Sequence, residues 1–342
     1  MIDDSGILTR SMEEPDIYAC LSTMLVQEHY YLCHDYLNLS GRQPAHQNMM
    51  YGRCDPIDEL CRSKMTEWCF HVVDCTNLRR ETVSIAMGYL DRFLCTTSLR
   101  AEQARCDRKE YQLAAMTALY VAVKIFEPLE MDAGLVSKLS RGLHSAAEIT
   151  RLEHEMLVAL NWRMNCPSPY QICNFLLELL PETAQDVKPT LYDYCHFQTE
   201  LATGDYAYVP LRRSVVAVAA VLNALEGINQ QDLPIPDRMK FINSISSALD
   251  YDICSPVVNA VRIRLLESFA KSSGFALPQA GLIPVVDSKP TGCDAMFIGG
   301  ETHLNSGKID EFGESPVCIS KEMAISLGTD VHSTWEQEHN SI

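Results

Sequence analysis

The chain has 342 residues, of which 47% are hydrophobic, so it contains enough apolar side chains to build one large or two ordinary packed domains. Its formal net charge of −17 argues against direct binding to nucleic-acid phosphates or to an anionic membrane surface. The sequence contains neither an apolar run long enough to cross a bilayer nor a basic-then-apolar secretory signal, so a soluble intracellular protein is expected.

The predicted elements are helices, beginning with a leading helix over residues 14–39, which are rich in Leu, Met and Tyr. Helical patterns resume at residue 56 and continue to about residue 164. In the segment 81–96 the apolar residues recur at i, i+3, i+4 and i+7, which indicates an amphipathic helix with one apolar face. Three polar residues are expected to cap the starts of helices: Asn77, Asp132 and Ser145.

A break at Cys166-Pro-Ser-Pro separates this series from a second one, because proline disfavours helix in the preceding residue and cannot continue a helix. Beyond residue 274, glycine, proline and acidic residues occur without periodicity, which is typical of a disordered tail. The predicted division is an N-terminal helix and linker (1–55), two helical units (56–165 and 166–272) and a disordered acidic tail (273–342).

Two segments, Ala114–Ile125 and Val215–Leu225, are apolar on nearly every side, so each must be a helix that other helices enclose. Each segment is preceded by two helical patterns and followed by two more, which predicts a five-helix unit used twice. The other helices of the first unit are expected at 57–75, 81–96, 132–139 and 146–160, and those of the second at 170–180, 187–203, 236–249 and 256–269. The predicted fold class is therefore all-α.

Motifs for catalysis and metal binding are missing from the sequence. The run Gly300–Lys308 has the wrong glycine spacing for a phosphate-binding loop, and His154-Glu155 is not followed by the second histidine of a metalloprotease. The closest cysteines (Cys54, Cys61, Cys69 and Cys75) contain no Cys-x-x-Cys pair, which disfavours a zinc site. We therefore expect no catalytic residue, no metal and no cofactor.

Four charged residues lie within otherwise apolar helices, and a buried charge requires a partner. Arg62 and Asp91 are expected to pair with each other and to join the first two helices of the first unit. Lys124 lies at the end of an enclosed helix and Glu153 lies on a later one. These two residues are either a local, solvated salt bridge or a surface that a partner protein contacts.

Three segments resemble the cyclin box: Met87–Leu94, Ala122–Glu127 and Arg151–Trp162. The hallmark residues of that family fall on Arg62, Asp91, Leu113, Lys124 and Glu153. Residues 99–108 are additional to the family's usual spacing, and we interpret them as a lengthened loop. The segment 160–176 and the leading helix are most similar to D-type cyclins.

This resemblance implies two consecutive cyclin folds and a non-catalytic subunit that activates a cyclin-dependent serine/threonine kinase in cell-cycle progression, with a G1/S role favoured. It also implies that Lys124 and Glu153 contact main-chain groups around the mobile helix of the kinase N-lobe. The same resemblance implies that Phe126, Glu127 and Glu130 extend this kinase-binding surface. The expected location is the nucleus and the cytoplasm, without direct contact to nucleic acid or membrane.

Other interpretations remain open at this point. Many cell-cycle cyclins bind substrates or inhibitors in a groove, to which Met65 and Trp68 would correspond, but Lys64 and His71 depart from that pattern and Trp68 also suits a core position. Ser315, which precedes a proline in the acidic tail, is a candidate phosphorylation site or part of a solvated linker. A transcription-type cyclin, a cyclin-fold transcription factor and an acidic scaffold without a kinase are alternative functions.

Overall fold

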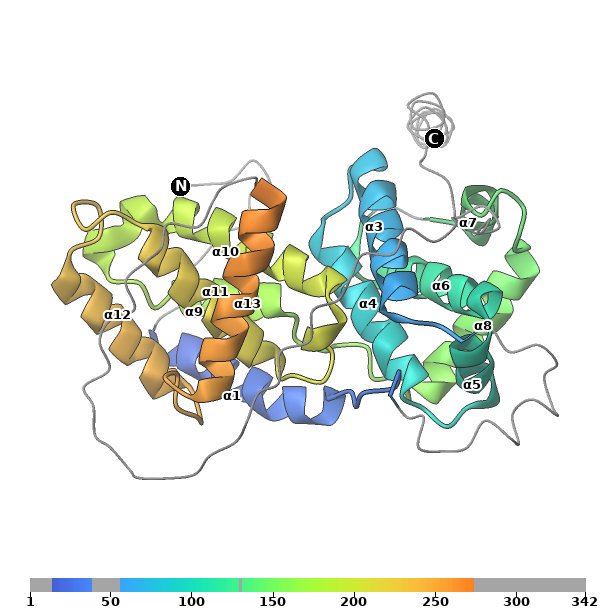
Figure 1. The fold of residues 1–342 in the computed structure, drawn as a ribbon, viewed down its shortest axis with the longest axis horizontal. Coiled ribbons are helices and arrows are strands. Elements are labelled where there is room, and N and C mark those ends of the chain that lie inside the picture. The colour runs from blue at the N-terminus through green and yellow to red at the C-terminus, as the bar shows by residue number, and fades with distance from the viewer. Residues whose placement is uncertain (1–13, 39–55, 129–130, 274–342) are drawn as a thin grey trace, which may run out of the picture.

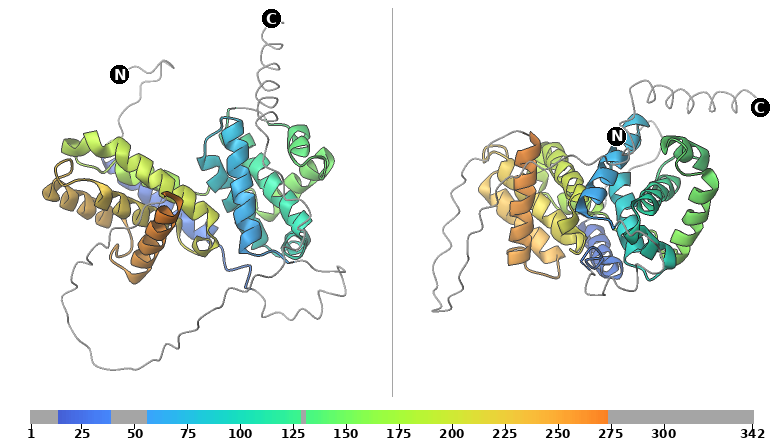
Figure 2. Two further views of the ribbon diagram at one scale, coloured as in Figure 1. Left: turned by 45° about the horizontal axis from the view of Figure 1, so that its top comes forward. Right: turned by 45° about the vertical axis from the view of Figure 1, so that its right-hand side comes forward.

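The structure is a computed structural model that describes residues 14–38, 56–128 and 131–273. The regular elements in these ranges are all helices, which confirms the predicted fold class. Figures 1 and 2 show two groups of helices side by side, one for each predicted unit, with a leading helix lying along the second group. Across these ranges, none of the helices is long and apolar enough to cross a bilayer.

The first repeat is built around a long helix that its neighbours enclose. Every residue of this central helix from Leu113 to Val123 is buried, because its apolar side chains leave no polar face. The helices of this repeat are α3 (Glu59–Cys75), α4 (Glu81–Leu94), α5 (Leu99–Cys106), the central α6 (Arg108–Phe126), α7 (Ala133–Leu139) and α8 (Ala146–Ala159).

The second repeat has the same plan, with a central helix whose residues 214–221 are all buried. Its α-helices are α9 (Pro169–Leu177), α10 (Lys188–Gly204), the central α11 (Arg213–Gly227), α12 (Ile235–Ala248) and α13 (Pro256–Ser273). Two short 3₁₀ helices, η2 (Glu182–Val187) and η3 (Tyr206–Tyr208), lie on either side of α10.

The prediction of a lengthened loop over residues 99–108 is wrong, because most of this segment forms helix α5. The Ser98 side chain accepts a hydrogen bond from the Ala101 amide at the start of α5. Ala101 and Ala104 lie one turn apart and are both buried, and α5 packs on α6. This two-residue apolar stripe is too narrow to stand out in the sequence, but its small side chains let the two helices approach closely.

The leading helix is shorter than predicted. Helix α1 covers Glu14–Glu28, and a single 3₁₀ turn, η1 (His29–Tyr31), follows it before the backbone becomes extended at Leu32. The extended segment makes hydrogen bonds to both repeats, since the Tyr36 hydroxyl donates to Asp91 (2.8 Å) and the Leu37 amide donates to the Tyr206 hydroxyl (3.0 Å). These long-range contacts replace the helical hydrogen bonds that a continuous helix to residue 39 would have made.

Two of the three predicted helix caps are confirmed. Asp132 accepts a hydrogen bond from the Leu135 amide, and Ser145 forms a reciprocal capping box with Glu148 at the start of α8. Asn77 does not cap α4, which starts without a side-chain cap. Instead, Asn77 adopts a left-handed conformation (φ 54°) just after the end of α3, a conformation that asparagine tolerates better than most residues.

Candidate functional site

The structure brings Lys124 and Glu153 together. The Lys124 ammonium, in the last turn of α6, lies 2.6 Å from a carboxylate oxygen of Glu153 on α8. The Lys124 side chain is 45% exposed and that of Glu153 is 13% exposed, so solvent reaches the pair mainly from the lysine side. The ammonium also lies 5.0 Å from the centre of the buried Tyr120 ring, which adds a cation–π contact.

Local sequence explains why the two helices present these residues at one place. Helix α6 ends at Phe126 because Glu127, which precedes Pro128, adopts an extended conformation (φ −107°, ψ 145°). Helix α8 begins at the Ser145 capping box, and Ile149, Leu152 and Met156 bury its apolar stripe. Glu153 is adjacent to that stripe, which explains why its side chain is mostly covered.

The electrostatics of the pair keep the lysine charged. The hydrogen bond and the negative charge of Glu153 raise the pKa of Lys124 above its ordinary value and outweigh the small opposing effect of burial. An ammonium group has three donors, so the contact to Glu153 leaves hydrogen-bonding capacity for acceptors on another molecule.

The three residues expected to extend this surface differ in their placement. Phe126 is half-buried and packs against the core of the first repeat. The Glu127 side chain is only 3% exposed and turns inward, where it accepts hydrogen bonds from the Arg79 amide (3.2 Å) and from the Thr82 hydroxyl. Glu127 therefore offers no free carboxylate next to Lys124. Glu130 lies outside the described residues.

The inward role of Glu127 is one that sequence reasoning missed. Its carboxylate binds backbone and side-chain groups at the start of α4, where the sequence supplies no other cap. The Arg79 guanidinium completes the contact by donating to the Phe126 carbonyl at the end of α6. The only local signal was a glutamate placed directly before a helix-ending proline.

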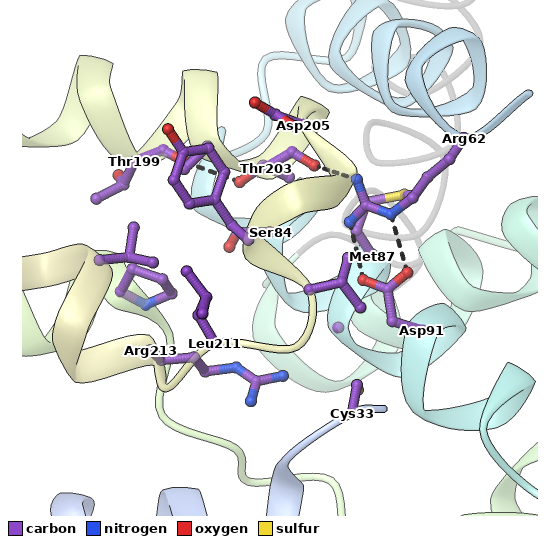
Figure 3. Close-up of a pocket in the computed structure, with 16 residues that line it drawn as sticks. Cys33, Arg62, Ser84, Met87, Asp91, Thr199, Thr203, Asp205, Leu211 and Arg213 are labelled. Atoms are coloured by element: carbon purple, nitrogen blue, oxygen red, sulfur yellow. Dashed lines mark hydrogen bonds and ion pairs between the residues drawn. The ribbon is translucent and has the colours of Figure 1, made fainter. Parts of the chain in front are cut away.

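The predicted pair of Arg62 and Asp91 is confirmed and is almost fully buried. The guanidinium donates to both carboxylate oxygens, with Nε–Oδ1 at 2.9 Å and Nη2–Oδ2 at 2.8 Å (Figure 3). Its third nitrogen donates to the Thr203 carbonyl at 2.7 Å, and Asp91 also accepts from Tyr36. Burial alone would lower the pKa of Arg62, but the Asp91 carboxylate outweighs it and raises that pKa.

The remaining residues singled out in the first repeat lie in the core. Leu113 is 2% exposed on α6, as a structural position requires. Met65 and Trp68 on α3 are each 4% exposed and belong to the same apolar cluster. These two side chains therefore offer little surface to a docking peptide. Ser315 lies outside the described residues.

Comparison with known proteins finds a family model that matches the first repeat and relatives that carry cyclin names. The family model described as "Cyclin, N-terminal domain" matches residues 30–165. The chain is 24% identical over 193 residues to the G1/S-specific cyclin-D1 of Mus musculus, an alignment that covers 56% of this chain and 63% of that protein. It is 27% identical over 258 residues to the G2/mitotic-specific cyclin-B2 of Oryzias latipes, covering 73% of this chain and 62% of that protein.

The fold agrees with this match. The solved structure of a viral cyclin from herpesvirus saimiri superposes with a TM-score of 0.54 at 18% sequence identity, covering 74% of this chain and 99% of the viral one. The alignments to the two cellular relatives span less than two thirds of their length. Residues 30–165 therefore match a cyclin N-terminal domain, and the fold of the described residues is similar to that of a viral cyclin.

Proposed function

We propose that this protein is a non-catalytic regulatory subunit that binds and activates a cyclin-dependent serine/threonine kinase. The observation that carries the proposal is the partly exposed pair of Lys124 and Glu153, which occupies the positions that correspond to the kinase-binding lysine and glutamate of the cyclin box. The match of residues 30–165 to a cyclin N-terminal domain supports a regulatory rather than an enzymatic role.

The chemistry of the pair suits recognition of a helix through its backbone. A lysine donates to main-chain carbonyls and a glutamate accepts from main-chain amides, so neither contact requires a particular side chain on the kinase. The two charges already lie 2.6 Å apart in the free protein, so a kinase would cover a neutral pair rather than an isolated charge. Glu153 is also held in place by its partly buried position, which reduces the conformational entropy lost on binding.

Apolar side chains next to the pair would supply contact area. Ile125, which follows Lys124, is 43% exposed. Leu157, one turn after Glu153, is half-buried. A polar pair with apolar neighbours is a common composition for a protein–protein interface.

Activation would follow from preference for one conformation of the kinase. An active kinase needs its mobile N-lobe helix turned inward, so that a glutamate on that helix pairs with a lysine on a neighbouring strand. A subunit that binds this inward position better than the outward one shifts the kinase population toward the active state. The role of Lys124 and Glu153 is to hold the helix there.

Within this class we favour a G1/S role, because residues 160–176 resemble D-type cyclins. The matched relatives carry both G1/S-specific and G2/mitotic-specific names, so the type needs its own test. Partner kinases copurified from synchronised cells would identify it. We propose the nucleus and the cytoplasm as the places of action.

The test of the site uses Lys124→Ala and Glu153→Ala in the full-length chain. We expect each variant to capture at least tenfold less of its cyclin-dependent kinase and to stimulate its activity correspondingly less. Far-UV circular dichroism should stay unchanged, because a partly exposed ion pair contributes only about 0–1 kcal/mol to stability. The matched control is Lys188→Ala, which removes another lysine–glutamate pair (Nζ–Oε2 2.7 Å to Glu178) from the second repeat.

Two results would contradict different parts of this proposal. If both variants capture the kinase as well as the unmodified chain does, the site assignment is wrong although the function stands. If the unmodified chain neither captures nor stimulates any member of a panel of purified cyclin-dependent kinases, the proposed function itself is wrong. A salt-sensitive shift of DNA in that case would favour a transcription factor.

A further inference from the structure

Two cysteines from distant parts of the sequence meet where the leading segment passes the end of α4. Cys33 lies on the extended segment after η1, and Cys95 is the residue that directly follows α4. Both are free thiols, and they are hydrogen-bonded to each other. The Cys95 sulfur also lies 3.6 Å from the carbonyl oxygen of His34, the residue next to Cys33. The fold therefore holds these two sulfurs in contact.

This contact places the two thiols close to the arrangement of a disulfide. The sulfur atoms of a disulfide are about 2.0 Å apart, and the bond tolerates only a limited range of backbone separations. Two hydrogen-bonded thiols reach that distance by rotation of their side chains and a small approach. Cys33 belongs to an extended segment rather than to a helix, so its backbone adjusts to such a bond more easily than a helical residue would.

The two thiols differ in their acidity. Their mutual hydrogen bond raises the pKa of Cys33 and lowers the pKa of Cys95, and the positive charge of Arg105 lowers the Cys95 pKa further. Arg105 is held beside Cys95 because its guanidinium donates to the carbonyls of Leu94 and Thr96, on either side of that residue. Cys95 is therefore the thiol that ionises more easily, whereas Cys33 retains its proton.

The pair is also within reach of a small molecule from solvent. Cys33 is 6% exposed and Cys95 is half-buried. The second repeat contains another pair of hydrogen-bonded thiols, Cys173 and Cys195, but both are 0% exposed, and burial raises the pKa of Cys195. That buried pair offers neither an accessible sulfur nor a readily formed thiolate. Contact between thiols is thus shared by both pairs, and access distinguishes the pair at the end of α4.

We propose that Cys33 and Cys95 form a reversible oxidation site, at which a peroxide converts the two thiols to a disulfide and Cys95 is the attacking group. The Cys95 thiolate attacks one peroxide oxygen and breaks the O–O bond, which leaves a sulfenic acid on Cys95 and releases the other oxygen as hydroxide. The Cys33 sulfur then attacks the Cys95 sulfur, and the sulfenic oxygen leaves as water with the Cys33 proton.

The electrons and atoms of this sequence balance. The two thiols lose two electrons, hydrogen peroxide gains them, and their two protons convert its oxygens to two molecules of water. A dithiol reductant reverses the reaction by thiol–disulfide exchange and is itself oxidised. This inference depends on the contact of Cys33 with Cys95 and not on the proposed kinase partner.

The bond would fasten the leading segment to the first repeat. The same segment already donates from Tyr36 to Asp91 of α4 and from Leu37 to Tyr206 of the second repeat. A disulfide that closes a long loop restricts the unfolded chain, so oxidation is expected to stabilise the fold. It should also slow hydrogen exchange over residues 32–37, which the bond would hold against α4.

The test treats the fully reduced full-length chain with a stoichiometric amount of hydrogen peroxide. We expect peptide mapping without reduction to find a Cys33–Cys95 cross-link, and dithiothreitol to remove it. The melting temperature should rise by at least about 4 °C on oxidation and return on reduction. The control Cys254→Ser removes an exposed thiol between α12 and α13, and it should keep the full response.

Two single variants test the assigned roles. In Cys33→Ser the attacking thiol has no partner, so dimedone, which labels sulfenic acids, should modify Cys95 after peroxide treatment. In Cys95→Ser we expect no cross-link and at least fivefold less label on Cys33. The proposal is overturned if peroxide oxidises other cysteines while this pair stays reduced, or if Cys33→Ser carries no label on Cys95. The first of these results comes from the unmodified chain, so it does not depend on the folding of a variant.

Discussion

The packing of the His196 side chain on α10 makes the stability of the fold depend on pH. Its ring stacks on Tyr170 with centroids 3.8 Å apart, and its Nε2 lies 2.7 Å from the Asn174 side-chain oxygen. Burial lowers its pKa to about 4, and the nearby charge of Asp193 opposes this effect only in part. The imidazole is therefore neutral in the folded protein at pH 7.

This lowered pKa predicts a loss of stability in mild acid. An unfolded histidine takes up a proton near pH 6.5, whereas the folded one takes it up only near pH 4. The contribution of His196 is therefore present above pH 6.5 and decreases as the pH falls toward 4. Urea unfolding at several pH values should show a steeper decline for the unmodified chain than for His196→Gln. Parallel pH profiles would contradict this expectation.

At the scale of elements, α1 is attached to the second repeat through one glutamate. Glu28 is 0% exposed, and its carboxylate accepts from Arg212 Nε (2.7 Å), from the Ser214 amide (2.9 Å) and from the Ser214 hydroxyl (2.7 Å). Ser214 is in the first turn of α11, where backbone amides lack helical partners and negative charge is favoured. The last residue of α1 therefore acts as the cap of the central helix in the second repeat.

Removing that carboxylate should loosen α1. We expect Glu28→Ala to lower the free energy of unfolding by about 3 kcal/mol, because it breaks a buried ion pair and leaves the start of α11 uncapped. Hydrogen exchange should accelerate over residues 14–28. Glu14→Ala, which changes an exposed residue of the same helix, should shift stability by less than about 0.5 kcal/mol. Unchanged exchange in Glu28→Ala would rule out this attachment.

Some helices of this protein are predicted well from the sequence, and others are not. Helices α6 and α11 were recognised because a segment that is apolar on all sides has only one stable position, inside other helices. Helix α5 was missed because its apolar face consists of Ala101 and Ala104, whose burial depends on the presence of α6. The end of α1 was misplaced for a similar reason, since partners distant in sequence hold the residues after it.

At the scale of the whole molecule, the two repeats are joined by polar contacts as well as by packing. Arg62 pairs with Asp91 within the first repeat and donates to Thr203 of α10 in the second. Arg80, next to α4, pairs with Glu200 of α10 at 2.8 Å. Because these contacts cross the boundary, we expect the repeats to unfold together.

Breaking the buried pair should weaken both repeats. We expect Arg62→Ala to lower the free energy of unfolding by about 3–5 kcal/mol, because it leaves Asp91 buried without its counter-ion. Hydrogen exchange of α6 and α11 should accelerate together in this variant. Lys240→Ala removes an exposed pair and should cost no more than about 0.5 kcal/mol. Acceleration confined to α6 would show that the repeats unfold independently.

The candidate site followed from sequence only in part. Lys124 and Glu153 were singled out because charges in apolar helices are unusual, and the structure brings them together. Glu127 was grouped with them through the resemblance to the cyclin box, but its carboxylate turns toward the start of α4.

Sequence by itself determined the helical class, the two repeats with their enclosed central helices and the pairing of Arg62 with Asp91. These features depend on apolar periodicity and on the cost of burying a single charge, and both can be read along one chain. Tertiary structure alone decided where α1 stops and which way Glu127 turns. Each of these outcomes depends on a partner far away in the sequence, whose position exists only after the helices have packed.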